Sequence, residues 1–113
     1  MSDPRRARIA RNESAFRALN ESLEASVHSG RPDDDLAGFV CECGDSQCDT
    51  TVRVTLPTYE SVRRDSMLFL VARGHEVAEV EDVVDEGDGY VVVRKHEDTR
   101  DIVEDADRRH DGG

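Results

Sequence analysis

Apolar residues in the first thirty positions recur with helical spacing. Ile9, Phe16, Leu19, Leu23 and Val27 follow one another at intervals of seven, three, four and four residues. At about 100° per residue these positions fall in one stripe along a helix. The pattern therefore predicts an N-terminal amphipathic helix that buries this stripe.

Signals at both ends bound this helix. Asp3 is expected as the N-cap with Pro4 at the first helical position, and Gly30 supplies the stop. Asn12 and Asn20 lie on or beside the apolar stripe, where an amide needs hydrogen-bond partners. Two interpretations stay open. Each amide meets a loop carbonyl or water, or both bind the backbone of the cysteine loop described below.

Beyond residue 38 the pattern changes to short apolar runs, several of them alternating with polar residues. A short helix is predicted over 57–64, and turn residues occupy 44–47 and 86–89. The turns favour a first and a last hairpin. Five strands are predicted: 39–43, 51–56, 67–71, 79–85 and 90–95.

The element order predicts an α+β fold, in which the first helix packs on a small antiparallel sheet. The chain has 113 residues, of which 36% are hydrophobic and none is Trp, so its core is lean. One domain is expected over 1–96. Residues 97–113 hold few apolar side chains, namely Ile102, Val103 and Ala106, and predict a disordered acidic tail.

The chain is strongly acidic, with 26 Asp and Glu against 15 Lys and Arg and a net charge of −11. A polyanion such as nucleic acid is repelled by that field, although Arg5, Arg6, Arg8 and Arg11 form a basic N-terminal segment. No leader or membrane-spanning run is found in the sequence, and three cysteines fit a reducing compartment. A cytoplasmic protein without membrane association is therefore expected.

Cys41, Cys43 and Cys48 lie within eight residues around a turn. Cysteines two apart share one face of a strand, and a bend at Gly44 would return the third thiol to the same ion. Three thiolates in this spacing predict Zn²⁺ bound in a zinc knuckle, residues 41–48. The alternative without a metal is that Cys41 is a small core residue on its strand, while Cys43 and Cys48 are free or paired with each other. An iron–sulfur cluster is disfavoured because a fourth cysteine is absent from the sequence.

The fourth ligand is predicted to be His75, which follows Arg73-Gly74 in a loop after a strand. The alternative side chains are the other histidines and two nearby acids: His28, His96, His110, Asp45 and Asp49. A water molecule in the fourth position would instead leave an open and potentially catalytic site. A closed site would be structural and would stabilise a lean core.

Other short motifs accompany the cysteines. They include Asn12-Glu13, Asn20-Glu21, Tyr59-Glu60, Gly74-His75-Glu76 and Tyr90-Val91-Val92-Val93. With the cysteines they resemble a family of small, largely uncharacterised actinobacterial proteins with a C-x-C-x4-C … Gly-His pattern, over residues 8 to 95. The resemblance implies that the three cysteines and His75 form one site, and it implies no activity.

The sequence thus predicts a non-enzymatic, zinc-stabilised interaction or regulatory module that binds a protein partner. No nucleophile with a base and an orienting group is found in the sequence, and no glycine-rich phosphate loop follows a predicted strand. The alternatives are a nucleic-acid-associated transcription regulator that uses the N-terminal arginines, or a thiol-based redox or zinc sensor.

Overall fold

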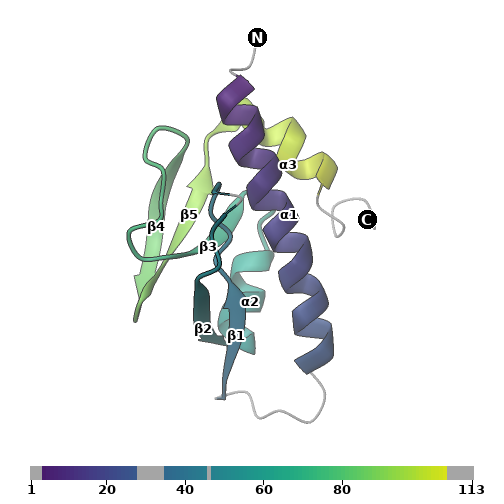
Figure 1. The fold of residues 1–113 in the computed structure, drawn as a ribbon, viewed down its shortest axis with the longest axis vertical. Helices are drawn as coiled ribbons and strands as arrows, with labels where there is room; N and C mark the ends of the chain where they lie inside the picture. The colour runs from purple at the N-terminus through teal and green to yellow at the C-terminus, as the bar shows by residue number, and fades with distance from the viewer. Residues whose placement is uncertain (1–3, 28–34, 46, 107–113) are drawn as a thin grey trace.

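The structure is a computed structural model that describes residues 4–27, 35–45 and 47–106. One long helix runs the length of the molecule beside two small antiparallel sheets, and a short C-terminal helix lies against it (Figure 1). The predicted α+β class is confirmed. The elements are α1 Pro4–Val27, β1 Leu36–Val40, β2 Thr51–Thr55, α2 Leu56–Arg63, β3 Leu68–Ala72, β4 Glu81–Gly87, β5 Tyr90–Lys95, the 3₁₀ turn η1 Glu97–Thr99 and α3 Arg100–Ala106.

The strands form a two-stranded sheet, β1–β2, and a three-stranded sheet in the order β3–β5–β4. The bounds of β5 match the prediction, and the other strands shift by a few residues. The largest shift concerns β1, which ends at Val40 and not at Cys43. Cys41 and Cys43 therefore lie in the loop that follows the strand, where the backbone is free to bend.

The core lies between the sheets and the helices. Phe39 of β1 stacks on Tyr59 of α2, with ring centroids 4.3 Å apart. Phe69, Leu70 and Val71 of β3 are fully buried. Cys41 and Cys43 belong to the same buried cluster, so the cysteine loop is part of the core and not an appendage.

The buried face of α1 differs from the predicted stripe. Leu19 is 46% exposed, and Phe16 and Leu23 are only partly buried. Beside Ala10, the face turned to the sheets carries a series of polar residues spaced as one helical side: Glu13, Arg17, Asn20 and Glu24. Polar side chains occupy this face because partners inside the fold satisfy them. Ile9 of the predicted stripe is buried, but at Phe16, Leu19 and Leu23 the prediction of a buried apolar stripe is wrong.

Glu13 illustrates how such a residue is tolerated inside the fold. Its carboxyl lies 2.8 Å from the ammonium of Lys95, the only lysine of the chain, and Glu81 lies 3.5 Å from the same nitrogen. All three side chains are fully buried. One positive charge therefore faces two carboxyl groups. Burial first, and then the hydrogen bond to Glu81, raise the pKa of Glu13 well above its ordinary value.

We expect the Glu13→Gln variant to lose part of the pH dependence of stability. Because the pKa of Glu13 is raised in the folded protein, its contribution is full below about pH 4.5, the ordinary pKa, and is lost as pH rises through the folded-state value. Glutamine resembles the protonated acid and does not titrate. Urea unfolding from about pH 5 to about pH 8 should show wild type losing stability relative to Glu13→Gln. Parallel curves for the two proteins would contradict this assignment.

The prediction of a disordered tail from residue 97 is wrong as far as residue 106. Residues 97–99 form η1 and 100–106 form α3, in which Val103 is fully buried and Ile102 packs against the core. The guanidinium of Arg17 donates hydrogen bonds to the carbonyls of Ser66 and Val103. It also lies 4.4 Å from the centre of the Phe69 ring. The domain boundary predicted at residue 96 therefore falls inside the ordered fold.

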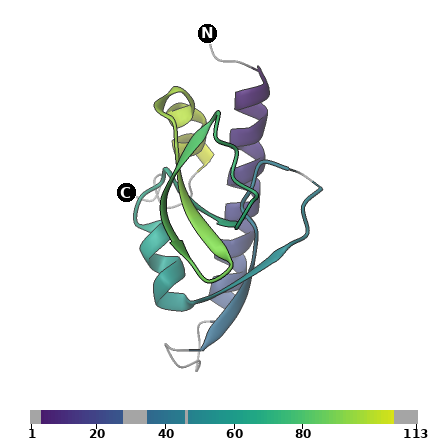
Figure 2. The same cartoon turned by 90° about the vertical axis from the view of Figure 1, so that its left-hand side faces the viewer.

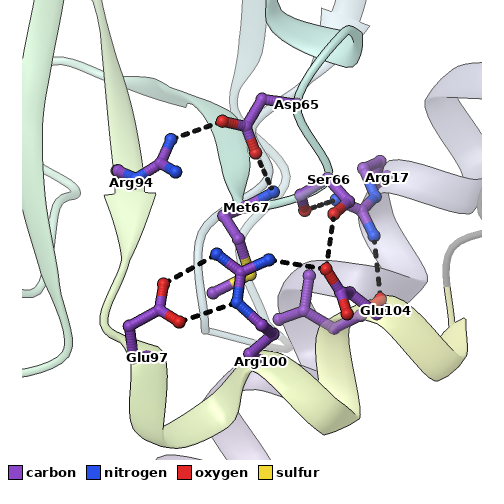
Figure 3. Close-up of polar contacts among 9 residues, drawn as sticks. Arg17, Asp65, Ser66, Met67, Arg94, Glu97, Arg100 and Glu104 are labelled. Atoms are coloured by element: carbon purple, nitrogen blue, oxygen red, sulfur yellow. Dashed lines mark hydrogen bonds and ion pairs between the residues drawn. The ribbon is translucent and has the colours of Figure 1, made fainter.

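Arg6 of α1 pairs with Asp98 of η1 at 3.3 Å, and further ion pairs form within and beside this segment. Arg100 lies between Glu97 and Glu104, at 2.7 Å and 2.6 Å, and Asp65 pairs with Arg94 nearby (Figure 3). A count of apolar residues misses these contacts, because charged side chains make them: the buried Arg17 donates to one carbonyl of α3, that of Val103, and to the carbonyl of Ser66 outside it.

Several predictions fall on residues outside the described ranges. These are the N-cap at Asp3, the helix stop at Gly30, the candidate ligands His28 and His110, and residues 107–113 of the tail. Within the ranges that are described, no helix combines the length and the apolar character needed to cross a bilayer.

Candidate metal centre

The structure brings Cys41, Cys43, Cys48 and His75 together. One ligand atom from each of these side chains lies within 4.8 Å of every other. Cys41 and Cys43 are buried, whereas Cys48 and His75 are partly exposed. The predicted set of three cysteines and one histidine therefore forms one compact cluster.

Two segments far apart in the sequence supply the cluster. The cysteines come from the loop between β1 and β2, and His75 comes from the turn after β3. In that turn the N–H of His75 donates to the carbonyl of Ala72 at 3.0 Å, and Gly74 has a φ of +91°. Positive φ at the third position of such a turn favours glycine. The turn reverses the chain and directs the imidazole toward the cysteines.

The distances match a tetrahedral metal site. The Nδ1 atom of His75 lies 3.6 Å from the sulfur of Cys41 and 3.5 Å from that of Cys48. With metal–sulfur bonds of about 2.3 Å and a metal–nitrogen bond of about 2.0 Å, tetrahedral geometry places sulfur and nitrogen ligands about 3.5 Å apart. The two nitrogen–sulfur distances therefore match those expected around one tetrahedral metal ion, and the sulfur of Cys43 lies within 4.8 Å of the other donor atoms.

Backbone donors surround the sulfurs. The N–H of Ala72 donates to Cys41 at 3.1 Å. Burial raises the pKa of Cys41 and of Cys43, while backbone donors from Ala72 and Asp45 oppose that rise. Burial also raises the pKa of Cys48, but hydrogen bonds from Thr50 and from its neighbours outweigh it and lower the pKa to about 7. N–H groups directed at sulfur favour thiolates, which are the form that binds metal.

Helix α1 holds the cysteine loop through Gly44. The amide of Asn12 donates to the carbonyl of Gly44 at 2.9 Å. A Cβ at Gly44 would lie 2.3 Å from Cγ2 of Ile9, so only glycine fits beneath the helix. The hydrogen bond confirms, for Asn12, the prediction that the helix amides bind the cysteine loop.

Asn20 closes the edge of β1 just before the loop. Its Oδ1 accepts from the N–H of Val40 and its Nδ2 donates to the carbonyl of Val40, each at 2.8 Å. Nδ2 also donates to Glu42 inside the loop. The side-chain amide pairs with one strand residue as a neighbouring strand would.

Glu42 lies between two ligands and anchors them. Its carboxylate accepts from Nδ2 of Asn20 at 2.8 Å, the hydroxyl of Tyr59 at 2.7 Å and the N–H of Leu70 at 3.0 Å. Glu42 is fully buried. Burial raises its pKa, while these three donors lower it. Since all three partners donate, they favour the carboxylate over the acid.

The described alternatives for the fourth ligand lie outside the cluster. Asp45 accepts a hydrogen bond from the N–H of Gln47, and His96 pairs with Asp82 at 3.4 Å. Asp49 is likewise absent from the group. Because the cluster already offers four side-chain donors, a water molecule is not needed as a ligand.

A shallow hollow of about 230 Å³ opens beside the centre. Cys43 and His75 line it, together with Gly44, Asp45, Gly74 and Val77. Solvent and small solutes therefore reach one side of the cluster, while the core covers the other.

Replacing Gly74 with alanine is expected to weaken metal binding about tenfold. The space around Gly74 is open, so the substitution acts through backbone strain at φ +91° and displaces the turn that positions His75. Gly89→Ala is the matched control, because Gly89 has a φ of +81° and equally open surroundings but lies in another turn. Competition against a chromophoric chelator measures both affinities. Equal losses in the two variants would contradict a specific role of the His75 turn.

Sequence reasoning missed the residues that hold the ligands in place. The sequence pattern does not single out Glu42, yet it accepts three hydrogen bonds. Glu13, Arg17 and Asn20 recur at intervals of four and three residues. Polar residues at this spacing are as typical of an exposed helix face, so the sequence holds no signal that marks this face as buried.

The chain matches no protein-family model, no curated protein and no solved structure. The resemblance to small actinobacterial proteins therefore stays a prediction. The case for a metal centre rests on the geometry of the four side chains.

Proposed function

We propose that this protein is a non-enzymatic, zinc-stabilised module that binds a protein partner. The observation that carries the proposal is the cluster of Cys41, Cys43, Cys48 and His75, whose four donor atoms lie within 4.8 Å of one another. Three thiolates and one imidazole suit Zn²⁺ better than hard cations, which prefer oxygen. Four protein ligands leave no open position for a substrate, as is typical of structural zinc sites.

Because a structural ion takes no part in chemistry, the function of such a module lies in the contacts that its surface makes. The ion joins the β1–β2 loop to the turn after β3, so it holds the two small sheets in one arrangement. Exposed apolar side chains on these strands and on α1 include Leu19, Leu36, Val83 and Val84. Such side chains are available to a protein partner. The fold then serves as a rigid frame for contact.

Metal analysis and affinity capture test the two halves of the proposal. Protein purified without added metal should carry one equivalent of zinc, and iron or no metal would contradict the first half. Capture from native lysate should enrich a partner with wild type and lose it with Cys48→Ser, which removes a ligand. Repeated failure to enrich any partner over a bead control would contradict the second half.

A thiol-based sensor is the second candidate, and the exposure of the site favours it. Cys48 is partly exposed and Cys43 borders the open hollow. Hydrogen peroxide would oxidise two thiolates to one disulfide, with cleavage of the O–O bond and formation of two hydroxide ions, and the metal would be released. Retention of zinc at sub-millimolar peroxide would exclude this candidate.

Nucleic-acid binding has weaker support. Arg5 pairs with Glu79 at 2.8 Å and Arg6 with Asp98 at 3.3 Å. These pairs offset two of the four N-terminal arginines in a chain whose net charge is −11.

A further inference from the structure

Two of the sheet edges are closed by contacts within the chain. At β1, Asn20 binds both the N–H and the carbonyl of Val40. At β3, the carbonyl of Leu70 accepts from the N–H of Glu42 at 2.8 Å, and the N–H of Leu70 donates to the Glu42 carboxylate. At these positions both edges are already occupied by partners within the chain.

A third edge, that of β4, carries the features that prevent strand addition. Its register with β5 shifts between Val83 and Asp85, which marks a bulge. Acidic side chains, including Asp82 and Glu86, are exposed along the strand. A bulge and a row of charges are common protections of an exposed edge.

The outer edge of β2 differs from these three. The N–H of Cys41 donates to the carbonyl of Thr50, so these residues form a hydrogen-bonded pair of the antiparallel ladder. Hydrogen-bonded pairs alternate along such a ladder. The peptide groups of Thr51 and Arg53 therefore face away from β1. Within the described ranges, neither peptide group has a hydrogen-bond partner on that side.

A groove of about 500 Å³ follows this edge. All five residues of β2 line it, with Leu36 and Thr58 at its sides and residues 88–90, the end of the β4–β5 hairpin, as the opposite wall. Figure 2 shows the turn of this hairpin beside the strand that leads into α2. The groove thus combines unpaired peptide groups with apolar contact from Leu36, which is 52% exposed, and from Tyr90.

We propose that this groove binds an extended segment of a partner protein, which adds to β2 as a strand and places an acidic side chain beside Arg53. The proposal rests on the proposed function and specifies its binding mode. Added strands gain main-chain hydrogen bonds from an open edge and specificity from the side chains around it. The exposed guanidinium of Arg53 has no ion-pair partner among the described residues. Asp88, on the far wall, confines an acidic group to the β2 side.

A second copy of the chain fits this edge poorly. Antiparallel pairing of two β2 strands about their centre would place Arg53 opposite Arg53. Like charges directly opposite each other destabilise a strand pair. An acidic side chain of a bound peptide would be attracted to Arg53, whereas the second Arg53 of a dimer would be repelled by it.

A library of displayed random peptides of about eight residues tests this proposal on the zinc-loaded full chain. Selected peptides should be enriched in Asp and Glu within β-prone sequences. Their binding should fall at least about tenfold with Arg53→Glu. Arg64→Glu, which changes the net charge equally at an exposed arginine outside the groove, should bind as wild type. Hydrogen exchange should show new protection at the amides of Thr51 and Arg53.

Arg53→Pro gives a second test of the edge itself. The N–H of Arg53 faces away from β1, so proline leaves the β1–β2 ladder intact while it removes a donor from the edge. Binding should again fall at least about tenfold. If this variant loses zinc and does not fold, Arg53→Glu still decides the question, because that side chain is exposed.

Three outcomes would contradict the proposal that an acidic segment binds in this groove. Equal losses with Arg53→Glu and Arg64→Glu would show that only bulk charge matters. Protection confined to other strands would place the peptide elsewhere. Sedimentation that shows wild type to dimerise through β2 would assign the edge to a second copy. The zinc content of the same samples separates these results from failure of the zinc module, because fully metal-loaded protein without peptide binding contradicts the groove alone.

Discussion

Replacing Cys41 with serine is expected to abolish stoichiometric metal binding and to lower the free energy of unfolding by at least about 4 kcal/mol. Cys41 is 1% exposed and belongs to both the core and the ligand set. Structural zinc contributes roughly 10 to 16 kcal/mol of apparent binding free energy in small domains, against a net stability of about 5 to 15 kcal/mol. Metal analysis and urea unfolding at fixed free zinc measure the two effects.

The histidine ligand offers a cleaner comparison. His75→Ala should lose metal in the same assay, and His96→Ala should retain it. His96 is a suitable control because its imidazole is also partly buried but pairs with exposed Asp82, and not with a cysteine. One equivalent of tightly bound metal in His75→Ala would show that the fourth ligand has been assigned wrongly.

Replacing Glu42 with glutamine is expected to lower the free energy of unfolding by about 3 kcal/mol. Glutamine keeps the size of the side chain but replaces one acceptor oxygen of the carboxylate with an NH₂ group, which cannot accept a hydrogen bond. Asn20, Tyr59 and Leu70 each donate to this carboxylate, and buried donors that lose their acceptor cost free energy. Because Glu42 separates Cys41 from Cys43, metal affinity should fall as well. Urea unfolding and chelator competition on the same protein give both values.

Tyr59→Phe is the control for Glu42→Gln. It removes one donor, keeps the stacking on Phe39, and leaves two donors on the carboxylate. A loss of about 1 kcal/mol is expected, with little effect on metal affinity. If Glu42→Gln were no more harmful than Tyr59→Phe, the carboxylate would not be the anchor of the loop.

Much of the fold could be predicted because its strands follow local rules. The alternation in β2 and the glycine-containing turn before Tyr90 place hairpins without reference to the rest of the chain. The buried face of α1 could not be predicted in this way. Arg17 is buried only because the carbonyls of Ser66 and Val103 come together in space, far from it in sequence. Long-range partners of polar groups are invisible to apolar periodicity.

The four residues of the candidate metal centre could be predicted more fully than the residues that hold them in place. Cysteine spacing and a glycine before His75 are local signals, and both carry chemistry of their own. The anchoring of Glu42 depends on three elements that meet only in the folded protein. Its residue type alone indicates an exposed acid, since glutamate is rarely buried without partners.

The pairing of Asn20 with Val40 limits how many chains an assembly through these sheets is able to contain. A sheet that is open at both edges adds strands at each end and grows into fibres. Here a helix side chain occupies the peptide groups of Val40 at the far edge, that of β1. If a partner segment adds to β2 as proposed, this contact opposes a second addition at β1. The groove proposal therefore predicts a one-to-one complex and no fibre.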